Sequence, residues 1–205
     1  MKKNMARVLV VVLAVTVAIC FKPCHAYTLD PNSEQLHPQG ARRITPRRNV
    51  TPEFLETHNK ARAAVGVAPF SWSPSLAESA GDIAWSMIRD ERGCHSSLLT
   101  RGLDRLHDIG SYNLHWDSDR DRNPRILTPG KVVDEWVAMK KYYDYDRNSC
   151  VRNSNCSTYT QVVWRKSLEL GCAQEGCNDL PWVRYTFVTL CLYSPPGNVP
   201  GERPY

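Results

Sequence analysis

The sequence predicts an α+β domain in which helices cover a small antiparallel sheet and three disulfides tie the elements together. Three observations support this class: apolar residues at helical spacing in the first two thirds of the chain, two β-rich alternating segments after them, and an even set of cysteines. The chain has 205 residues, of which 42% are hydrophobic and 23% charged. This size and composition suit one globular domain with short extensions.

The first 26 residues have the organisation of a secretory leader. Basic residues at the start precede the apolar run VLVVVLAVTVAIC, and a short exit sequence closes at Ala26. The apolar run is about 13 residues long, shorter than the roughly 20 residues that a membrane span needs. We therefore predict a signal peptide over residues 1–26, no transmembrane segment, and a protein secreted to the extracellular space, which is the apoplast if the source is a plant.

Removal of this leader changes the charge balance. The whole chain carries 26 basic and 21 acidic residues, and four of the basic residues lie in the leader. The remaining chain has 22 basic against 21 acidic residues, a net charge near +1 instead of +5. A nearly neutral chain gives no electrostatic support to nucleic-acid binding.

The cysteines indicate disulfides. Two of the eight leave with the leader, and the six that remain are Cys94, Cys150, Cys156, Cys172, Cys177 and Cys191. An even number in a secreted chain predicts three disulfides, and spacing alone leaves 15 pairings open. A zinc–thiolate site is the alternative, but the sequence holds no Cys-x-x-Cys pair and secretion favours oxidation.

Residues 27–51 predict a flexible, basic N-terminal extension, because they are polar, rich in proline and arginine, and without periodicity. The pairs Arg42-Arg43 and Arg47-Arg48 are either processing sites or part of a solvated arm, and we favour the arm. The sequon Asn49-Val50-Thr51 predicts glycosylation at Asn49.

Three helices are predicted in the domain at residues 52–193. Thr51 is expected to cap the first helix, FLETHNKARAAVG, which ends at Gly66. Its His58 invites a metal or base role, but we favour a histidine bonded to its neighbours. The second helix begins at residues 73–75 and ends near residues 92–93.

The third helix, KVVDEWVAMKKYYDY, follows Pro129-Gly130. Between the second and third helices, residues 97–130 are charged and predicted to be irregular, with DSDRDRNPR as an exposed loop. After the third helix, LELGCAQEG and WVRYTFVTLCLY predict two strands, paired antiparallel.

One stretch is more specific than the others. The run CSTYTQVVW spans Cys156 to Trp164, Cys172 follows eight residues later, and its TQVVW segment is predicted to be buried. This string resembles the central signature of the CAP superfamily of cysteine-rich secretory, antigen five and pathogenesis-related proteins, in its plant pathogenesis-related class-one branch. THNKARAAVGV and FSWSPSLAESA resemble the opening helix pair of the same family. The resemblance covers about residues 52–205.

This resemblance implies a fold and a disulfide pattern. The implied fold is a monomeric three-layer α-β-α sandwich. The implied disulfides are Cys94–Cys177, Cys150–Cys156 and Cys172–Cys191.

Many members of this family hold two histidines and two glutamates in a cleft that binds a divalent ion. At the matching positions this chain keeps His95 but has Tyr112, Met139 and Thr158. A site needs about three protein ligands, so His95 alone cannot build it. We therefore predict a degenerate tetrad, with no metal and no cofactor.

Substitute ligands are the alternative, and His107, His115 and Glu135 are the candidates. No spacing among them is diagnostic of a metal site. No GxSxG, HExxH or phosphate-binding glycine loop occurs either, so no catalytic residue is predicted. A metal-dependent hydrolase that uses His95 is kept as a third hypothesis on function.

The first hypothesis concerns a loop that the family associates with sterols or other small lipids. The matching aromatic and apolar residues here either form such a surface or pack the core, and both alternatives stay open. These residues are Tyr112, Leu114, Trp116, Ile126 and Leu127. On this hypothesis the protein is a secreted, non-enzymatic defence or stress protein that binds a sterol.

The second hypothesis concerns residues 194–205, which end in PPGNVPGERPY. This proline- and glycine-rich tail cannot form a helix or an interior strand. It resembles a defence peptide that plant members of the class release toward a receptor, and the matching residues are Pro195, Gly197, Asn198, Pro204 and Tyr205. In that class the residue before Tyr193 is usually asparagine, and here it is Leu192. We favour a tail clamped onto the intact domain, without excluding later release.

Overall fold

The computed structural model describes residues 41–44, 49–90, 93–94, 103, 106–107, 109–119, 127–179 and 184–205. All of them belong to one compact unit, His37–Tyr205. The predicted signal peptide lies outside the described residues. Among the helices that are described, none is long and apolar enough to cross a membrane.

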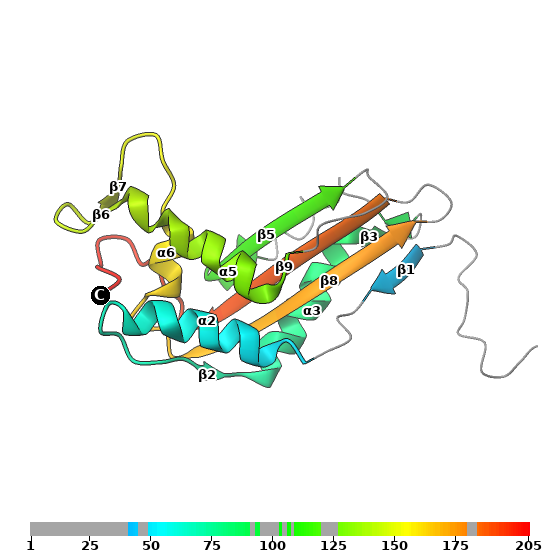
Figure 1. The fold of residues 1–205 in the computed structure, drawn as a ribbon, viewed down its shortest axis with the longest axis horizontal. Coiled ribbons are helices and arrows are strands. Elements are labelled where there is room, and N and C mark those ends of the chain that lie inside the picture. The colour runs from blue at the N-terminus through cyan, green and yellow to red at the C-terminus, as the bar shows by residue number, and fades with distance from the viewer. Residues whose placement is uncertain are drawn as a thin grey trace, which may run out of the picture. The chain divides into compact units, whose positions relative to one another are not determined.

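A five-stranded sheet forms the middle of the domain (Figure 1). The long strands β8 (Glu169–Asp179) and β9 (Arg184–Ser194) pair antiparallel along their whole length, as the sequence predicts. The strand β5 (Tyr112–Asp119) pairs antiparallel with the other side of β9. On its free side, β8 pairs antiparallel with β1 (Ala41–Ile44) at one end and parallel with β2 (Ser71–Trp72) at the other. The sheet is therefore mixed rather than purely antiparallel.

Helices cover both faces of this sheet, which gives the predicted three layers (Figure 1). The helices α2 (Thr51–Ala63), α5 (Pro129–Ala138) and α6 (Ser157–Val162) lie on one face. The helix α3 (Pro74–Ile88) lies on the other. The short η2 (Met139–Tyr142) continues α5 and leads into a small hairpin of β6 (Tyr143–Asp144) and β7 (Ser149–Cys150).

Two hydrophobic clusters join the layers. Because side chains alternate along a strand, β9 supplies both clusters. Cys191 and Tyr193 enter the cluster beneath α2, α5 and α6, whereas Leu190 and Leu192 enter the cluster beneath α3. At Gly171 the backbone of α3 comes so close to β8 that an added Cβ would lie 2.2 Å from the amide nitrogen of Ala77.

Five predictions about the elements are wrong in detail. The third helix does not extend through KVVDEWVAMKKYYDY: α5 ends at Ala138, and η2 and then the strand β6 follow. The extension contains the strand β1, which β8 holds in place through backbone pairing. The stretch predicted to be irregular, residues 97–130, contains β5. The first residues of β5 alternate and pair with the apolar residues of β9, and the charged residues after them continue the same pairing. The second helix ends earlier, at Ile88, and the chain turns back through β3 (Arg89–Asp90) and β4 (Gly93–Cys94). Thr51 is the first helical residue and not the cap.

The largest fully buried side chain is that of Arg62, near the end of α2. Its guanidinium donates hydrogen bonds to the backbone oxygens of Ala68 (2.6 Å), Trp164 (2.9 Å) and Ser167 (2.9 Å). It also lies 3.7 Å from the ring centroid of Phe70. Burial lowers the pKa of Arg62 to about 10, so the side chain stays charged at neutral pH. One cation thus joins α2 to the chain after α6.

His58, one turn earlier on α2, is buried and bonded at both ring nitrogens. Its Nδ1 lies 2.8 Å from the carbonyl oxygen of Phe54, and its Nε2 lies 3.0 Å from the hydroxyl of Tyr193. A carbonyl can only accept, so Nδ1 carries the proton and Nε2 accepts from the tyrosine. Burial lowers the pKa of His58 to about 4. The histidine is a neutral core residue bonded to its neighbours, which confirms the interpretation favoured from the sequence.

This arrangement predicts acid sensitivity. Unfolding returns His58 to a pKa near 6.5, so the unfolded chain binds an extra proton as the pH falls below that value, and stability is lost toward pH 4. Between pH 7 and pH 4.5 we expect this histidine to account for about 2.5 kcal/mol of lost unfolding free energy. Urea unfolding at both pH values, on the wild type and on His58→Gln, measures the difference. An equal loss in the two proteins would contradict the assignment.

Candidate functional site

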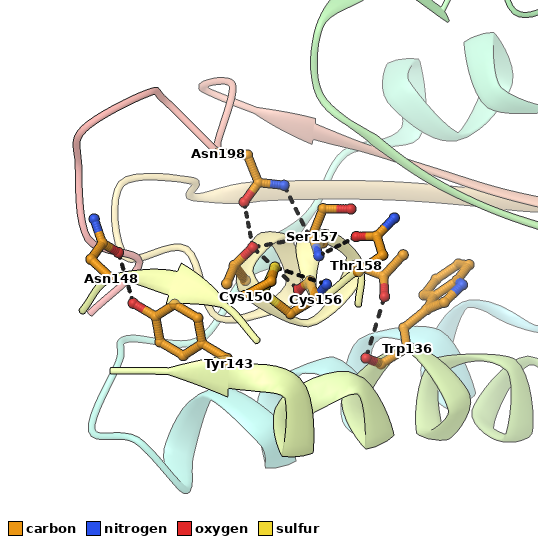
Figure 2. Close-up of a disulfide and its surroundings, with 10 residues drawn as sticks. Trp136, Tyr143, Asn148, Cys150, Cys156, Ser157, Thr158 and Asn198 are labelled. Atoms are coloured by element: carbon orange, nitrogen blue, oxygen red, sulfur yellow. Dashed lines mark hydrogen bonds between the residues drawn. A yellow bond between two sulfur atoms is a disulfide. The ribbon is translucent and has the colours of Figure 1, made fainter. Parts of the chain in front are cut away.

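The degenerate tetrad positions do not converge in the part of the chain that the structure describes. Tyr112 packs against the α3 cluster, whereas Met139 packs against the cluster beneath α2, α5 and α6, across the sheet. Thr158 lies in the first turn of α6, where its hydroxyl is 3.5 Å from the backbone oxygen of Trp136 (Figure 2). His95 lies outside the described residues. Three of the four positions therefore serve packing or local hydrogen bonding.

Two of the three substitute ligands do meet. The Nδ1 atom of His115 on β5 lies 3.2 Å from a carboxylate oxygen of Glu135 on α5. The other ring nitrogen of His115 is buried, and no described residue bonds it. His107 is exposed and joins no such group. Among the residues described, no three His, Cys, Asp or Glu side chains gather as a metal site would require.

Four of the five residues of the predicted lipid-binding loop are described, and they divide between the two faces of the sheet. Tyr112 and Leu114 face the α3 cluster, and Trp116 continues the same row with 43% of its surface exposed. Leu127 packs on the opposite face, against the α2–α5–α6 cluster, and its carbonyl oxygen accepts a hydrogen bond from Gln174. Ile126 lies outside the described residues. The surface that remains is the β5 strip, which we define as Tyr112, Leu114 and Trp116.

The described disulfides follow the pattern implied by the family resemblance. Cys172 and Cys191 face each other across β8 and β9 and are bonded in the core. Cys150 at the end of β7 is bonded to Cys156 at the start of α6 (Figure 2). Cys177 is also disulfide-bonded, and the side chain of Cys94 lies outside those described.

The tail, residues 194–205, is docked on the domain. The carbonyls of Ser194 and Pro195 each accept a hydrogen bond of 2.8 Å, from the backbone nitrogen of Leu168 and the hydroxyl of Ser167. The carbonyl of Pro204 accepts one of 2.7 Å from the backbone nitrogen of Arg165. Gly197 and Pro204 are buried. The favoured interpretation of the tail as clamped in the intact protein is confirmed.

An aromatic cluster at the end of the tail was missed by sequence reasoning. The ring of Tyr205 stacks on Tyr145 at a centroid distance of 5.2 Å, and its hydroxyl lies 3.1 Å from the hydroxyl of Tyr159. Burial raises the pKa of Tyr159, and the hydrogen bond to Tyr205 adds to the effect. The run Tyr142-Tyr143-Asp144-Tyr145 was the available signal, but nothing in it indicates a partner 60 residues away.

Asn49, the predicted glycosylation residue, lies at the entrance of α2. It is exposed, and its side-chain oxygen accepts a hydrogen bond of 3.0 Å from the backbone nitrogen of Thr51. An exposed position suits a sequon. Glycosylation itself stays a prediction.

Residues 55–193 match the cysteine-rich secretory protein family, CAP, and the chain therefore belongs to that family. Its relatives include plant pathogenesis-related proteins of the PR-1 type. The chain is 38% identical to pathogenesis-related protein 1C of Nicotiana tabacum over 159 residues, 77% of this chain and 82% of that protein. It is 39% identical to the PR-1 type protein of Sambucus nigra over 157 residues, 77% of this chain and 83% of that protein.

A further relative is the STS14 protein of Solanum tuberosum, 44% identical over 153 residues. The match covers 75% of this chain and 64% of the length of the STS14 protein. Among solved structures, Na-ASP-1 is similar with a TM-score of 0.55 at 19% identity, over 86% of this chain and 45% of that one. BmVAL-1 is similar with a TM-score of 0.52 at 19% identity, over 79% and 86%. The two structures support the fold alone.

Proposed function

We propose that this protein is an extracellular, non-enzymatic defence protein that binds a sterol or another small lipid at the β5 strip. The observation that carries the proposal is Trp116, a large aromatic side chain left 43% exposed at the end of an apolar row. An exposed tryptophan beside half-buried apolar neighbours is suited to an apolar ligand. The plant pathogenesis-related relatives and the predicted leader support the extracellular defence role.

The arrangement of the strip suits a flat, apolar ligand. Tyr112, Leu114 and Trp116 succeed one another on one face of β5, and each pairs in register with an apolar residue of β9. Among the described strands, β5 is the last in the sheet order, so the row lies at a sheet edge. Leu114 and Tyr112 are anchored in the α3 cluster, which leaves Trp116 as the residue that a ligand would cover first.

A non-enzymatic role agrees with the site chemistry. Hydrolysis needs an oriented nucleophile with its base, or a metal held by about three ligands. The described residues offer the pair His115–Glu135, with Glu135 largely exposed. The hypothesis of a metal-dependent hydrolase that uses His95 is the least supported, and it would require activity that His95→Ala abolishes.

We predict that the purified mature protein binds a fluorescent sterol saturably, and that Trp116→Asp weakens the binding by at least about tenfold, because a carboxylate would be desolvated against the ligand. A metal chelator should have no effect. Leu168→Asp is the matched control, since Leu168 is 55% exposed and lies just before β8, outside the strip.

Two results would contradict this proposal. One is a folded, oxidised protein that binds no sterol. The other is equal binding by the wild type and Trp116→Asp, which would show that the ligand binds outside the strip.

We propose as a second candidate that the segment Pro195–Tyr205 is a releasable defence signal. The observation that favours it is the junction at the start of the tail. Ser194 is half-buried and Pro195 and Pro196 are exposed, so a protease can reach the chain there. No cysteine lies in the segment, so a single cut would remove its only covalent link to the domain. Leu192 is buried in β9 and is not accessible to a protease in the folded protein.

The signal hypothesis predicts a fragment that begins at Pro195 in the extracellular fluid of tissue that expresses the protein. Mass spectrometry of that fluid, with a heavy-isotope peptide as standard, measures its amount against the intact chain. Two results would contradict this hypothesis. One is that all fragments found come from cuts at other positions, and the other is that the protein stays intact under defence-inducing conditions.

A further inference from the structure

The tail lies in a groove whose walls come from separate parts of the chain. One wall is α6 with the residues that follow it, up to Ser167. The other wall is the hairpin of β6 and β7. The disulfide Cys150–Cys156 joins the end of β7 to the start of α6, so a covalent bond that does not involve the tail links the two walls (Figure 2).

The first contact region of the tail is Gly197-Asn198, and at Gly197 the groove has room for glycine but not for a larger side chain. The backbone nitrogen of Gly197 donates a hydrogen bond of 3.1 Å to the hydroxyl of Ser111. An added Cβ on Gly197 would lie 2.6 Å from the side-chain oxygen of Gln161 and 2.8 Å from the Cγ atom of Trp164. The amide of Gln161 could shift, but the indole is packed in the core, so any larger residue would displace the tail.

Asn198 is recognised at both ends of its amide. Its oxygen accepts a hydrogen bond of 2.6 Å from the hydroxyl of Thr160, and its nitrogen donates one of 2.9 Å to the carbonyl oxygen of Ser157. Figure 2 shows this side chain directed at the start of α6. An aspartate would keep the first bond and face the carbonyl with an oxygen in place of the donor.

The second contact region holds the end of the tail. The carbonyl oxygen of Tyr205 accepts a hydrogen bond of 3.2 Å from the hydroxyl of Tyr145. The ring of Tyr205 also contacts Tyr143 and Tyr159, at centroid distances of 6.2 Å and 6.5 Å. Arg203 lies over the ring of Tyr145, 4.9 Å from its centroid, and bonds the carbonyl oxygens of Tyr145 and Asp146.

Between the two regions, Glu202 holds the tail through an ion pair, its carboxylate lying 2.7 Å from the ammonium of Lys166. A pocket of about 250 Å³ lies between residues 198–202 and the walls, bordered by Tyr143, Ser149 and Thr160 among others. The carbonyl oxygen of Glu202 still accepts a hydrogen bond of 3.0 Å from Asn148. The close contacts that select particular residue types lie at Gly197-Asn198 near the start and at Pro204-Tyr205 at the end.

We propose that this groove is a peptide-binding site, and that it retains the segment Pro195–Tyr205 as a non-covalent ligand after the chain is cut. Hydrolysis of the Ser194–Pro195 amide consumes one water and leaves a carboxylate on Ser194 and a secondary ammonium on Pro195. Both groups form where the chain is exposed or half-exposed, so neither new charge is buried in the groove. The contacts that the tail makes from Gly197 to Tyr205 can persist after the cut, because none of them involves the two new chain ends.

This inference deepens the second candidate function and rests on it only for its biological setting. On this account the domain is a carrier: a protease makes the peptide, and dissociation from the groove sets when it becomes free. The ligand class is an extended peptide with Gly-Asn near its start and Pro-Tyr at its end.

The test uses the full chain with a recognition sequence for a site-specific protease inserted between Ser194 and Pro195. After complete cutting, we expect the peptide to co-elute with the folded domain in gel filtration and to separate from it in denaturant. Competition with a labelled synthetic peptide of residues 195–205 then gives the dissociation rate.

Two variants test recognition in the cut protein. Gly197→Ala and Asn198→Asp should each speed dissociation by at least about tenfold, whereas the exposed Pro196→Ala should leave the rate nearly unchanged. Circular dichroism shows that each cut protein stays folded.

Immediate loss of the wild-type peptide from a folded domain would overturn the proposal, and so would equal rates for the wild type and both variants. The signal hypothesis fails separately. It fails if no fragment beginning at Pro195 occurs in extracellular fluid, and that result would leave retention in vitro intact.

Discussion

Arg62 donates hydrogen bonds from inside the core to the backbone oxygens of Trp164 and Ser167, and the position of the tail follows from that segment. The backbone nitrogen of Arg165 and the hydroxyl of Ser167 bond the two ends of the tail, at Pro204 and Pro195. A buried guanidinium is costly to leave unpaired, so the four carbonyl groups that accept its hydrogen bonds are fixed together. The opening helix thereby positions the last residues of the chain, far from it in sequence.

The same architecture gives new roles to the described positions that match the family's metal cleft. Tyr112, Met139 and Thr158 serve packing or hydrogen bonding, and the nearby His115 and Glu135 form an ion pair among the described residues. Two other surfaces keep unusual features. One is the β5 strip with its exposed tryptophan, and the other is the groove that holds the tail.

The sequence predicts those elements whose periodicity is strong and local. The helices from Thr51 and Pro74 and the strands β8 and β9 follow from alternation and turn residues. The strand β5 could not be predicted in this way, because the charged residues at its end are typical of a loop. It forms a strand through its pairing with β9. The sequence also could not separate Leu127 from Trp116, because the register of β5 decides the face of Trp116, whereas Leu127 lies outside any strand, just before α5.

Hydrogen–deuterium exchange of the full chain tests most directly whether Arg62 fixes the segment that holds the tail. In the wild type, the amides of Arg165 and Gly197 should exchange slowly, because both donate to partners in the docked structure. The variant Arg62→Lys keeps the positive charge but lacks the planar guanidinium with its several N–H donors. In this variant both amides should exchange faster than in the wild type. Rapid exchange at Gly197 in the wild type, or faster exchange at Arg165 without any change at Gly197, would contradict the account.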